Sequence, residues 1–267
     1  QRCGGDIPII AKIEKPQAVD KIDEIMDESE GIMVARGDLG IEISPQKVPM
    51  VQKMLVQKAN LKKKMVIVAT QMLETMVYEP LPTRAEVNDV ANAIVDGTDA
   101  VMLSGETTIG KYPVEAVRMM DDISVNVEDS NYYQGLHKFY TSRDLLREDP
   151  FYRDMIITRM IGELDVQAIL VVTESGFTAQ LLSKAKVIPP IIACCSSESV
   201  CRQMTLLSGV VPVHMSVDPF IGDEDMTSVL TELQNKSLVR PGDRLMLITG
   251  LPYFTLEKTT RLRYFTV

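Results

Sequence analysis

Three observations predict an α/β fold built on parallel sheets. Four apolar segments begin near residues 8, 32, 65 and 99, and each is followed by a stretch in which apolar residues recur at helical spacing. Every connection is long enough for the helical crossover that parallel strands need. A second alternation of strand and helix patterns begins after residue 150.

Local patterns define the elements of the first half. Apolar runs indicate strands, and prolines indicate helix starts, because proline suits the first helical turn. Arg36–Gly40 is expected to be the exit loop of the second strand, and Thr83 to cap a helix. We expect strands at 8–14, 31–35, 65–69 and 99–103, and helices at 16–28, 45–64, 84–95 and 113–127.

These four strand–helix units, residues 1–128, are expected to form the C-terminal half of a TIM (β/α)8 barrel. Each strand exits into a polar loop, and functional residues at the C-terminal ends of strands are typical of this barrel and of related sheets. Half a barrel has two open edges. We therefore expect a longer protein, and a first residue other than Met agrees with that expectation.

Residues 129–150 are polar and weakly periodic, so we expect a linker there. Residues 151–267 are expected to form a three-layer α/β/α domain. Its expected elements are helices near 151–164, 178–186, 197–207 and 226–237, and strands at 166–172, 190–195, 210–215, 243–249 and 261–267.

Composition narrows the class of protein. The 267 residues are 45% hydrophobic and 24% charged, which is an ordinary globular balance. A net charge of −9 disfavours nucleic acid and anionic membranes as partners. No apolar run reaches the roughly 18 residues of a membrane span, and we expect a cytoplasmic protein. The four cysteines form no CxxC pair, so Cys194 and Cys195 are expected to be packed free thiols.

The main candidate site lies at the first two strand ends. Lys12 and Glu14 share one face of a strand because side chains alternate. Asp38 follows the second strand beside Gly37, which lets backbone N–H groups approach an anion. A lysine and two carboxylates suit oxygen chemistry on a divalent cation. An ion pair at a strand end and a turn aspartate are the alternatives.

Hydroxyl groups follow the next two strands. Thr70 follows the third strand, where a helix cap is the alternative role. Ser104 follows the fourth strand together with Glu106, and a structural hydrogen bond is an equally good interpretation of this pair.

A possible anion site follows the first strand of the second domain. Thr173, Ser175, Gly176 and Thr178 precede a helix whose free N–H groups could bind a phosphate. Glu174 opposes that interpretation by its charge, and plain helix capping is the alternative.

Five motifs in order resemble the signatures of the pyruvate kinase family. They cover about residues 8–128, and residues 151–267 resemble the regulatory and assembly domain of that family. The motifs are Ile9–Lys15 (IIAKIEK), Met33–Gly40 (MVARGDLG), Ala69–Glu74 (ATQMLE), Pro82–Glu86 (PTRAE) and Met102–Thr107 (MLSGET).

The resemblance implies a role for each strand-end residue. Glu14 and Asp38 would bind Mg²⁺ or Mn²⁺, and Lys12 would stabilise the phosphoryl group and the developing enolate. The N–H groups of Gly37 and Asp38 would hold the substrate carboxylate. Thr70 would contact substrate near the face where the enolate is protonated.

The resemblance also implies the reaction and its partners. The phosphoryl group of phosphoenolpyruvate would pass to ADP, giving ATP and, after protonation, pyruvate. Ser104 would belong to a proton relay through water, and Arg84 would lie near a subunit contact of a homotetramer. The reaction belongs to glycolysis.

Several parts of the family pattern are absent from this sequence. The first four barrel strands and the lid domain are missing, and with them the K⁺ site, a phosphoryl-binding arginine and most nucleotide contacts. We therefore expect this chain to be inactive by itself. The family's effector loop often reads Ser-Gly-Arg-Ser, whereas Ser175–Thr178 reads SGFT, and Leu251–Thr255 replaces a glycine-rich loop. These differences argue against activation by a sugar bisphosphate and leave a monophosphate effector, or no effector, as the alternatives.

Two other functions fit part of the pattern. One is a metal-dependent aldolase or lyase on a related phosphoenolpyruvate/pyruvate-type barrel, which also pairs a strand-end Glu with an Asp. The other is a non-catalytic fragment that binds an effector or supports assembly.

Overall fold

The computed structural model describes residues 7–135, 160–217, 223–249 and 261–267. The chain divides into two compact units, Gln1–Tyr133 and Gln134–Val267. Most of the linker expected at 129–150 and of the helix expected at 151–164 lies outside the described residues, as does the segment Leu251–Thr255.

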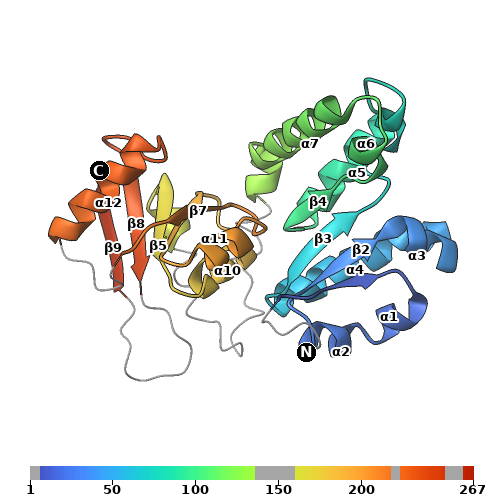
Figure 1. The fold of residues 1–267 in the computed structure, drawn as a ribbon, viewed down its shortest axis with the longest axis horizontal. Coiled ribbons are helices and arrows are strands. Elements are labelled where there is room, and N and C mark those ends of the chain that lie inside the picture. Colours follow the sequence, from blue (N-terminus) through green and yellow to red (C-terminus); the bar gives the residue numbers. More distant parts are fainter. Residues whose placement is uncertain (1–6, 136–159, 218–222, 250–260) are drawn as a thin grey trace. The chain divides into compact units, whose positions relative to one another are not determined.

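The first unit is built on a parallel sheet with the strand order β1-β2-β3-β4 (Figure 1). All neighbouring strands pair in parallel, so the C-terminal ends of all four strands meet at one edge of the sheet. The side chains of residues paired across these strands point to the same face. The strands are β1 (Ile10–Ile13), β2 (Gly31–Ala35), β3 (Met65–Ala69) and β4 (Ala100–Met102).

Each strand of this sheet is followed by helical segments, as expected for a β/α repeat. After β1 come α1 (Pro16–Asp20) and α2 (Ile22–Asp27); after β2 come α3 (Arg36–Glu42), the 3-10 helix η1 (Pro45–Lys47) and α4 (Val48–Leu61); after β3 come the 3-10 helix η2 (Glu74–Val77) and α5 (Arg84–Val95); after β4 come α6 (Gly105–Thr108) and α7 (Pro113–Glu128).

The helices cover one face of this sheet. Ile13, Val34 and Val68 lie in one register row and are almost completely buried. They share a hydrophobic core with residues of α2, α4, α5 and α7. The opposite face carries the row Lys12, Met33, Ile67 and Ala100, in which Lys12 is exposed and the others are half-buried. Coverage of one face only is the pattern of barrel strands, whose other face points to the barrel interior.

Three local expectations for this unit are wrong. The strand expected at 8–14 is shorter, because β1 spans only Ile10–Ile13, and only Ile13 of this edge strand is buried. The helix expected at 16–28 is interrupted at Lys21, whose ψ of 23° leaves the helical range. Arg36–Gly40 is not a loop but the start of α3, where the acidic Asp38 in the first turn suits the helix dipole.

The start of α5 is fixed by a capping box. The Thr83 hydroxyl accepts a hydrogen bond from the Glu86 N–H, and the Glu86 carboxylate accepts one from the Thr83 N–H at 2.7 Å. Burial raises the pKa of Glu86, but hydrogen bonds from Thr75 and Thr83 outweigh burial and keep that pKa below its usual value. The expected helix at 84–95 and its cap at Thr83 are thus confirmed.

The second unit is a five-stranded sheet in the order β7-β6-β5-β8-β9, parallel except for β9. Both faces are buried at its centre, since Ile169 and Leu170 point to opposite faces and neither is exposed. The elements are β5 (Ala168–Val172), α10 (Phe177–Lys184), β6 (Ile191–Cys195), α11 (Glu198–Met204), β7 (Val210–His214), α12 (Asp223–Asn235), β8 (Arg244–Thr249) and β9 (Arg261–Thr266).

Two further expectations concern this unit and the membrane. Cys194 and Cys195 are buried free thiols, as predicted, and burial raises the pKa of Cys194 to about 12. The helix expected near 226–237 begins earlier, because α12 spans Asp223–Asn235. Among the described residues, no helix has the length and apolar character that crossing a membrane requires.

Replacing Thr83 with Ala should destabilise the first unit by about 1 kcal/mol, because the cap loses the acceptor for the Glu86 N–H. Urea unfolding followed by circular dichroism measures the loss. The control is Thr107→Ala, since the Thr107 hydroxyl reaches the Ser104 carbonyl only at 3.4 Å. Equal losses in the two variants would show that the capping box contributes nothing specific.

Candidate functional site

The parallel register brings the predicted residues of the first unit to one edge of the sheet. Glu14 follows β1, Asp38 lies in α3 after β2, Thr70 follows β3 and Ser104 follows β4. Direct contacts join Lys12 to Glu14 and Asp38, and join Gly37 to Thr70. Ser104 belongs to a separate network around Glu106.

Lys12 bridges two carboxylates at the edge of the sheet. Its Nζ lies 2.6 Å from Glu14 Oε2 and 2.9 Å from Asp38 Oδ2. The side chains of Lys12 and Asp38 are each about half exposed, at 51% and 52%. Because solvent screens such pairs, this cluster adds little to stability. Its geometry matters more for the chemistry of the site, since the carboxylates of Glu14 and Asp38 both contact the Lys12 ammonium.

The electrostatics of the cluster follow from these contacts. Hydrogen bonds to Glu14 and Asp38 raise the pKa of Lys12, so its ammonium stays charged. The hydrogen bond from Lys12 lowers the pKa of Asp38, so this carboxylate stays charged well into acid. Lys12 and Asp38 therefore keep their charges throughout the neutral range.

The carboxylates fit a Mg²⁺ or Mn²⁺ ion that takes its other ligands from substrate and water. The Lys12 ammonium marks a point that carboxylate oxygens of both Glu14 and Asp38 approach closely. Within the described ranges, no group of three or more His, Cys, Asp or Glu side chains could hold a metal ion. Mg²⁺ commonly binds through only one or two carboxylates together with substrate phosphates.

Gly37 and Thr70 form the second contact between strand ends. The Gly37 N–H donates to Thr70 Oγ1 at 2.8 Å, and this hydroxyl donates to the Ala69 carbonyl at 2.6 Å. A Cβ at residue 37 would lie 3.4 Å from Thr70 Oγ1. That distance is an ordinary van der Waals contact, and the Gly37 N–H, predicted to meet substrate, already has an internal acceptor.

The backbone after β3 is strained. Thr70 and Gln71 have φ values of 67° and 54°, which L residues with side chains rarely adopt. Each such residue costs about 1–2 kcal/mol, and β-branching makes threonine a poor choice there. The surrounding structure must therefore hold this segment in place.

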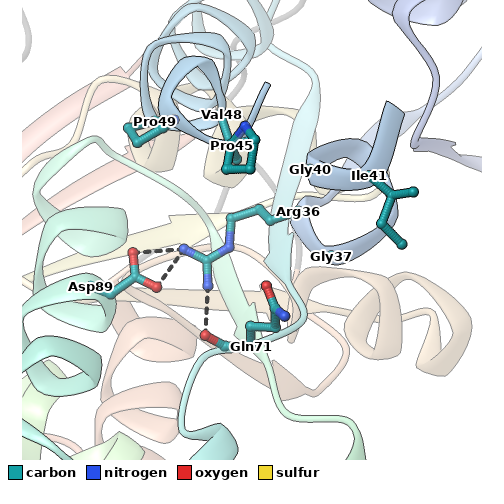
Figure 2. Close-up of a pocket in the computed structure, with 9 residues that line it drawn as sticks. All are labelled: Arg36, Gly37, Gly40, Ile41, Pro45, Val48, Pro49, Gln71 and Asp89. Carbon is teal, nitrogen blue, oxygen red and sulfur yellow. Dashed lines mark hydrogen bonds and ion pairs between the residues drawn. The ribbon is translucent and has the colours of Figure 1, made fainter. Parts of the chain in front are cut away.

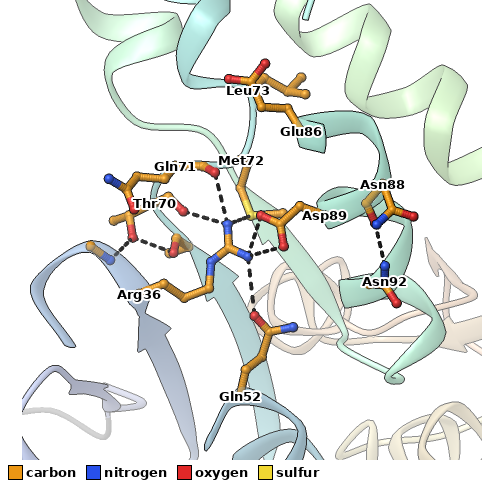
Figure 3. A network of polar contacts seen from close by, with 12 residues as sticks. Arg36, Gln52, Thr70, Gln71, Met72, Leu73, Glu86, Asn88, Asp89 and Asn92 are labelled. Atoms are coloured by element: carbon orange, nitrogen blue, oxygen red, sulfur yellow. Dashed lines mark hydrogen bonds and ion pairs between the residues drawn. The ribbon is translucent and has the colours of Figure 1, made fainter. Parts of the chain in front are cut away.

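A buried arginine, Arg36, supplies that support (Figure 3). One guanidinium nitrogen, Nη2, donates to the carbonyls of Thr70 and Gln71 at 2.8 and 3.1 Å. The other, Nη1, forms an ion pair with Asp89 at 2.6 Å and lies 3.4 Å from Gln52 Oε1. The sequence analysis missed Arg36 and Asp89, because a charged residue in an apparent exit loop gives no signal of burial.

A cavity of about 460 Å³ lies beside this arginine (Figure 2). Its polar lining comes from Arg36, Gln71 and Asp89. The rest of the lining consists of the glycine and apolar residues Gly37, Gly40, Ile41, Pro45, Val48 and Pro49.

Glu106 ties the ends of β3 and β4 together. Its fully buried carboxylate accepts hydrogen bonds from the Leu73 N–H at 3.1 Å and from the Ser104 N–H at 2.7 Å. The structural interpretation of Glu106 is thereby supported. The Ser104 carbonyl accepts from the Thr108 hydroxyl, so this motif forms a compact turn after β4.

The predicted anion loop of the second unit is closed on itself. The Gly176 N–H donates to the Thr173 hydroxyl at 3.0 Å, and the Phe177 N–H lies 3.4 Å from Ser175 Oγ. Gly176 has a φ of 78°, which explains the glycine. Thr173 and Thr178 are buried and Ser175 is exposed. A phosphate site at these four residues stays a prediction.

These features define a β/α-barrel protein of the class that places its functional residues at the C-terminal ends of the strands. Comparison with protein families then specifies the family within this class. The family described as "Pyruvate kinase, barrel domain" matches residues 1–117, and "Pyruvate kinase, alpha/beta domain" matches residues 155–263. The chain belongs to the pyruvate kinase family.

Curated relatives agree with this assignment. A pyruvate kinase of Geobacillus stearothermophilus is 45% identical over 256 residues, which are 92% of this chain and 42% of the relative. One of Thermococcus litoralis is 41% identical over 270 residues, covering 100% of this chain and 56% of the relative. One of Debaryomyces hansenii is 44% identical over 254 residues, or 92% and 50%. The chain thus spans about half the length of these relatives.

Removing the ammonium in Lys12→Met should raise the pKa of Asp38 towards its ordinary value of 3.8. Carbon-detected NMR titration of the Asp38 carboxyl group measures the shift. The control is Lys15→Met, which removes a lysine that pairs with Glu42 instead. An unchanged Asp38 titration in Lys12→Met would contradict the contact described for the cluster.

Replacing Glu106 with Gln should cost about 1–3 kcal/mol of stability, because the amide would turn an N–H donor towards a backbone N–H donor in a buried place. Chemical unfolding measures this cost. The exposed Glu115 on α7 offers a matched control, Glu115→Gln. A Glu106→Gln variant as stable as this control would rule out the bridging role.

Proposed function

We propose that this chain supplies the metal- and phosphoenolpyruvate-binding half of a pyruvate kinase. The whole protein would transfer the phosphoryl group of phosphoenolpyruvate to ADP and release pyruvate and ATP. The observation that carries this proposal is the cluster in which Lys12 meets both Glu14 and Asp38 at the strand ends. Membership of the family supports it.

The chemistry asks for charge neutralisation and positioning. In the first step the P–O bond of phosphoenolpyruvate breaks and a bond to a terminal phosphate oxygen of ADP forms, leaving an enolate. The Lys12 ammonium neutralises charge on the phosphoryl and enolate oxygens. A divalent cation held by Glu14 and Asp38 would supply further charge neutralisation when bound.

The neighbouring strand end orients the substrate. The substrate carboxylate would replace the Thr70 hydroxyl as acceptor for the Gly37 N–H, which is reasonable because an ionised acceptor binds an N–H more strongly. The Asp38 N–H, in the first turn of α3, would be a second donor. Thr70 would then lie beside the enolate, whose carbon takes a proton relayed through water near Ser104.

We propose that this chain by itself does not turn over. It covers about half the length of its relatives, and the resemblance to the family implies that the K⁺ site and most nucleotide contacts lie in the other half. Assembly into a homotetramer, with the exposed Arg84 near a subunit contact, and a cytoplasmic location are implied by the family and belong to the same proposal.

The test completes the barrel. We would fuse this chain to the portion of the Thermococcus litoralis relative that it does not cover, and measure ATP formed from phosphoenolpyruvate and ADP. The fusion should be active, and Lys12→Met or Glu14→Gln should each lower kcat about 100- to 1000-fold, because each removes charge compensation in the transition state. Lys15→Met is the matched control and should retain activity.

Two outcomes would contradict the proposal. One is a folded fusion that makes no ATP but releases pyruvate from a hydroxy-keto acid, which would indicate the lyase. The other is near-normal turnover in Lys12→Met.

Binding of Mn²⁺ to the chain alone, followed by electron paramagnetic resonance, tests the metal ligands separately. Binding should weaken in Glu14→Gln and Asp38→Asn but not in Glu42→Gln.

A further inference from the structure

We propose that Arg36 is a positioning residue: its buried guanidinium fixes the left-handed backbone of Thr70 and Gln71 and thereby places the Thr70 hydroxyl against the Gly37 N–H. The kinetic part of this inference rests on the proposed function. The structural part does not, and it can be tested on this chain alone.

The two terminal nitrogens of Arg36 have different partners: one anchors the guanidinium, and the other supports the strained segment. Nη1 pairs with Asp89 of α5 and lies near Gln52 of α4. Nη2 donates to both carbonyls of the strained segment, those of Thr70 and Gln71, and lies 2.9 Å from Met72 Sδ. The Arg36 side chain is only 8% exposed, whereas the side chain of its partner Asp89 is 40% exposed.

The same two strand ends are joined a second time through the backbone. Arg36 precedes Gly37, whose N–H donates to Thr70 Oγ1 at 2.8 Å. The side chain of Arg36 holds the Thr70 carbonyl, while the next residue meets the Thr70 hydroxyl. The contacts close a ring between β2 and β3, and Figure 3 shows the guanidinium beside the Thr70 and Gln71 carbonyls.

The fork of the guanidinium suits this double task. One nitrogen pairs with a carboxylate, while the other donates to the carbonyls of two consecutive residues that both have positive φ. A lysine ammonium has a single nitrogen and cannot serve both ends. Loss of the fork should release Thr70 into the extended conformations that a β-branched residue prefers.

The first experiment reads the backbone directly. In isotope-labelled chain, the Cα and Cβ chemical shifts of Thr70 and Gln71 report whether φ is positive. We expect them to move towards extended values in Arg36→Lys and Arg36→Met, and to stay unchanged in Arg118→Lys, which alters an exposed arginine of α7. Asp89→Asn, a milder change to the anchor, should shift them in the same direction and covers the case in which the Arg36 variants do not fold.

The second experiment is a double-mutant cycle in the completed protein. Arg36→Lys should lower kcat about 100-fold, the loss typical of a misplaced group. It should change the KM for phosphoenolpyruvate less than kcat. If Arg36 acts through the Thr70 hydroxyl, then Arg36→Lys should cost little further activity in a Thr70→Ala background.

The results separate the two claims. Unchanged Thr70 and Gln71 shifts in the folded Arg36 and Asp89 variants would overturn the positioning role, whatever the kinetics. Shifted resonances with fully additive kinetic losses would overturn the link to the Thr70 hydroxyl. A completed wild-type protein without kinase activity would refute the proposed function, while the chemical shifts would still decide whether Arg36 holds this segment.

Discussion

The candidate site of the first unit depends on the hydrogen bonds that the Arg36 guanidinium donates to the backbone after β3. Two consecutive residues with positive φ, Thr70 and Gln71, are unfavourable by themselves. Buried hydrogen bonds from a charged donor are among the stronger polar contacts, and two of them end on this segment. The ion pair with Asp89 lowers the cost of burying the charge. The strained segment is thus held indirectly by α5, whose Asp89 pairs with Arg36. This helix carries none of the predicted site residues.

The Lys12 cluster follows a different physical principle. Its residues are substantially exposed, so their contacts contribute little to folding. What they provide is charge that stays in place, since Glu14 and Asp38 raise the pKa of Lys12 and Lys12 lowers the pKa of Asp38. The site therefore combines the buried side chain of Arg36 and its contacts with a group of charges that is substantially exposed.

Sequence reasoning found the strands and the charged residues but not what holds them. Apolar runs placed β2 and β3 without error, and the alternation rule placed Lys12 and Glu14 on one face. The role of Arg36 could not be foreseen, because burial of a polar side chain depends on partners such as Asp89, 53 residues away in the chain. The glycines at 37 and 40 suggested a loop, whereas α3 forms there.

The one-sided covering of the four-stranded sheet also bears on how such a protein can change. Along β1, neighbouring positions meet different demands: Ile13 packs behind the sheet, while the side chain of Lys12 lies on the opposite face and is half exposed. Because the core residues lie behind the sheet, a substitution at an exposed position such as Lys12 leaves that packing intact and needs no compensating change in the core. This freedom follows from the β-strand itself, in which successive side chains point to opposite faces of the sheet.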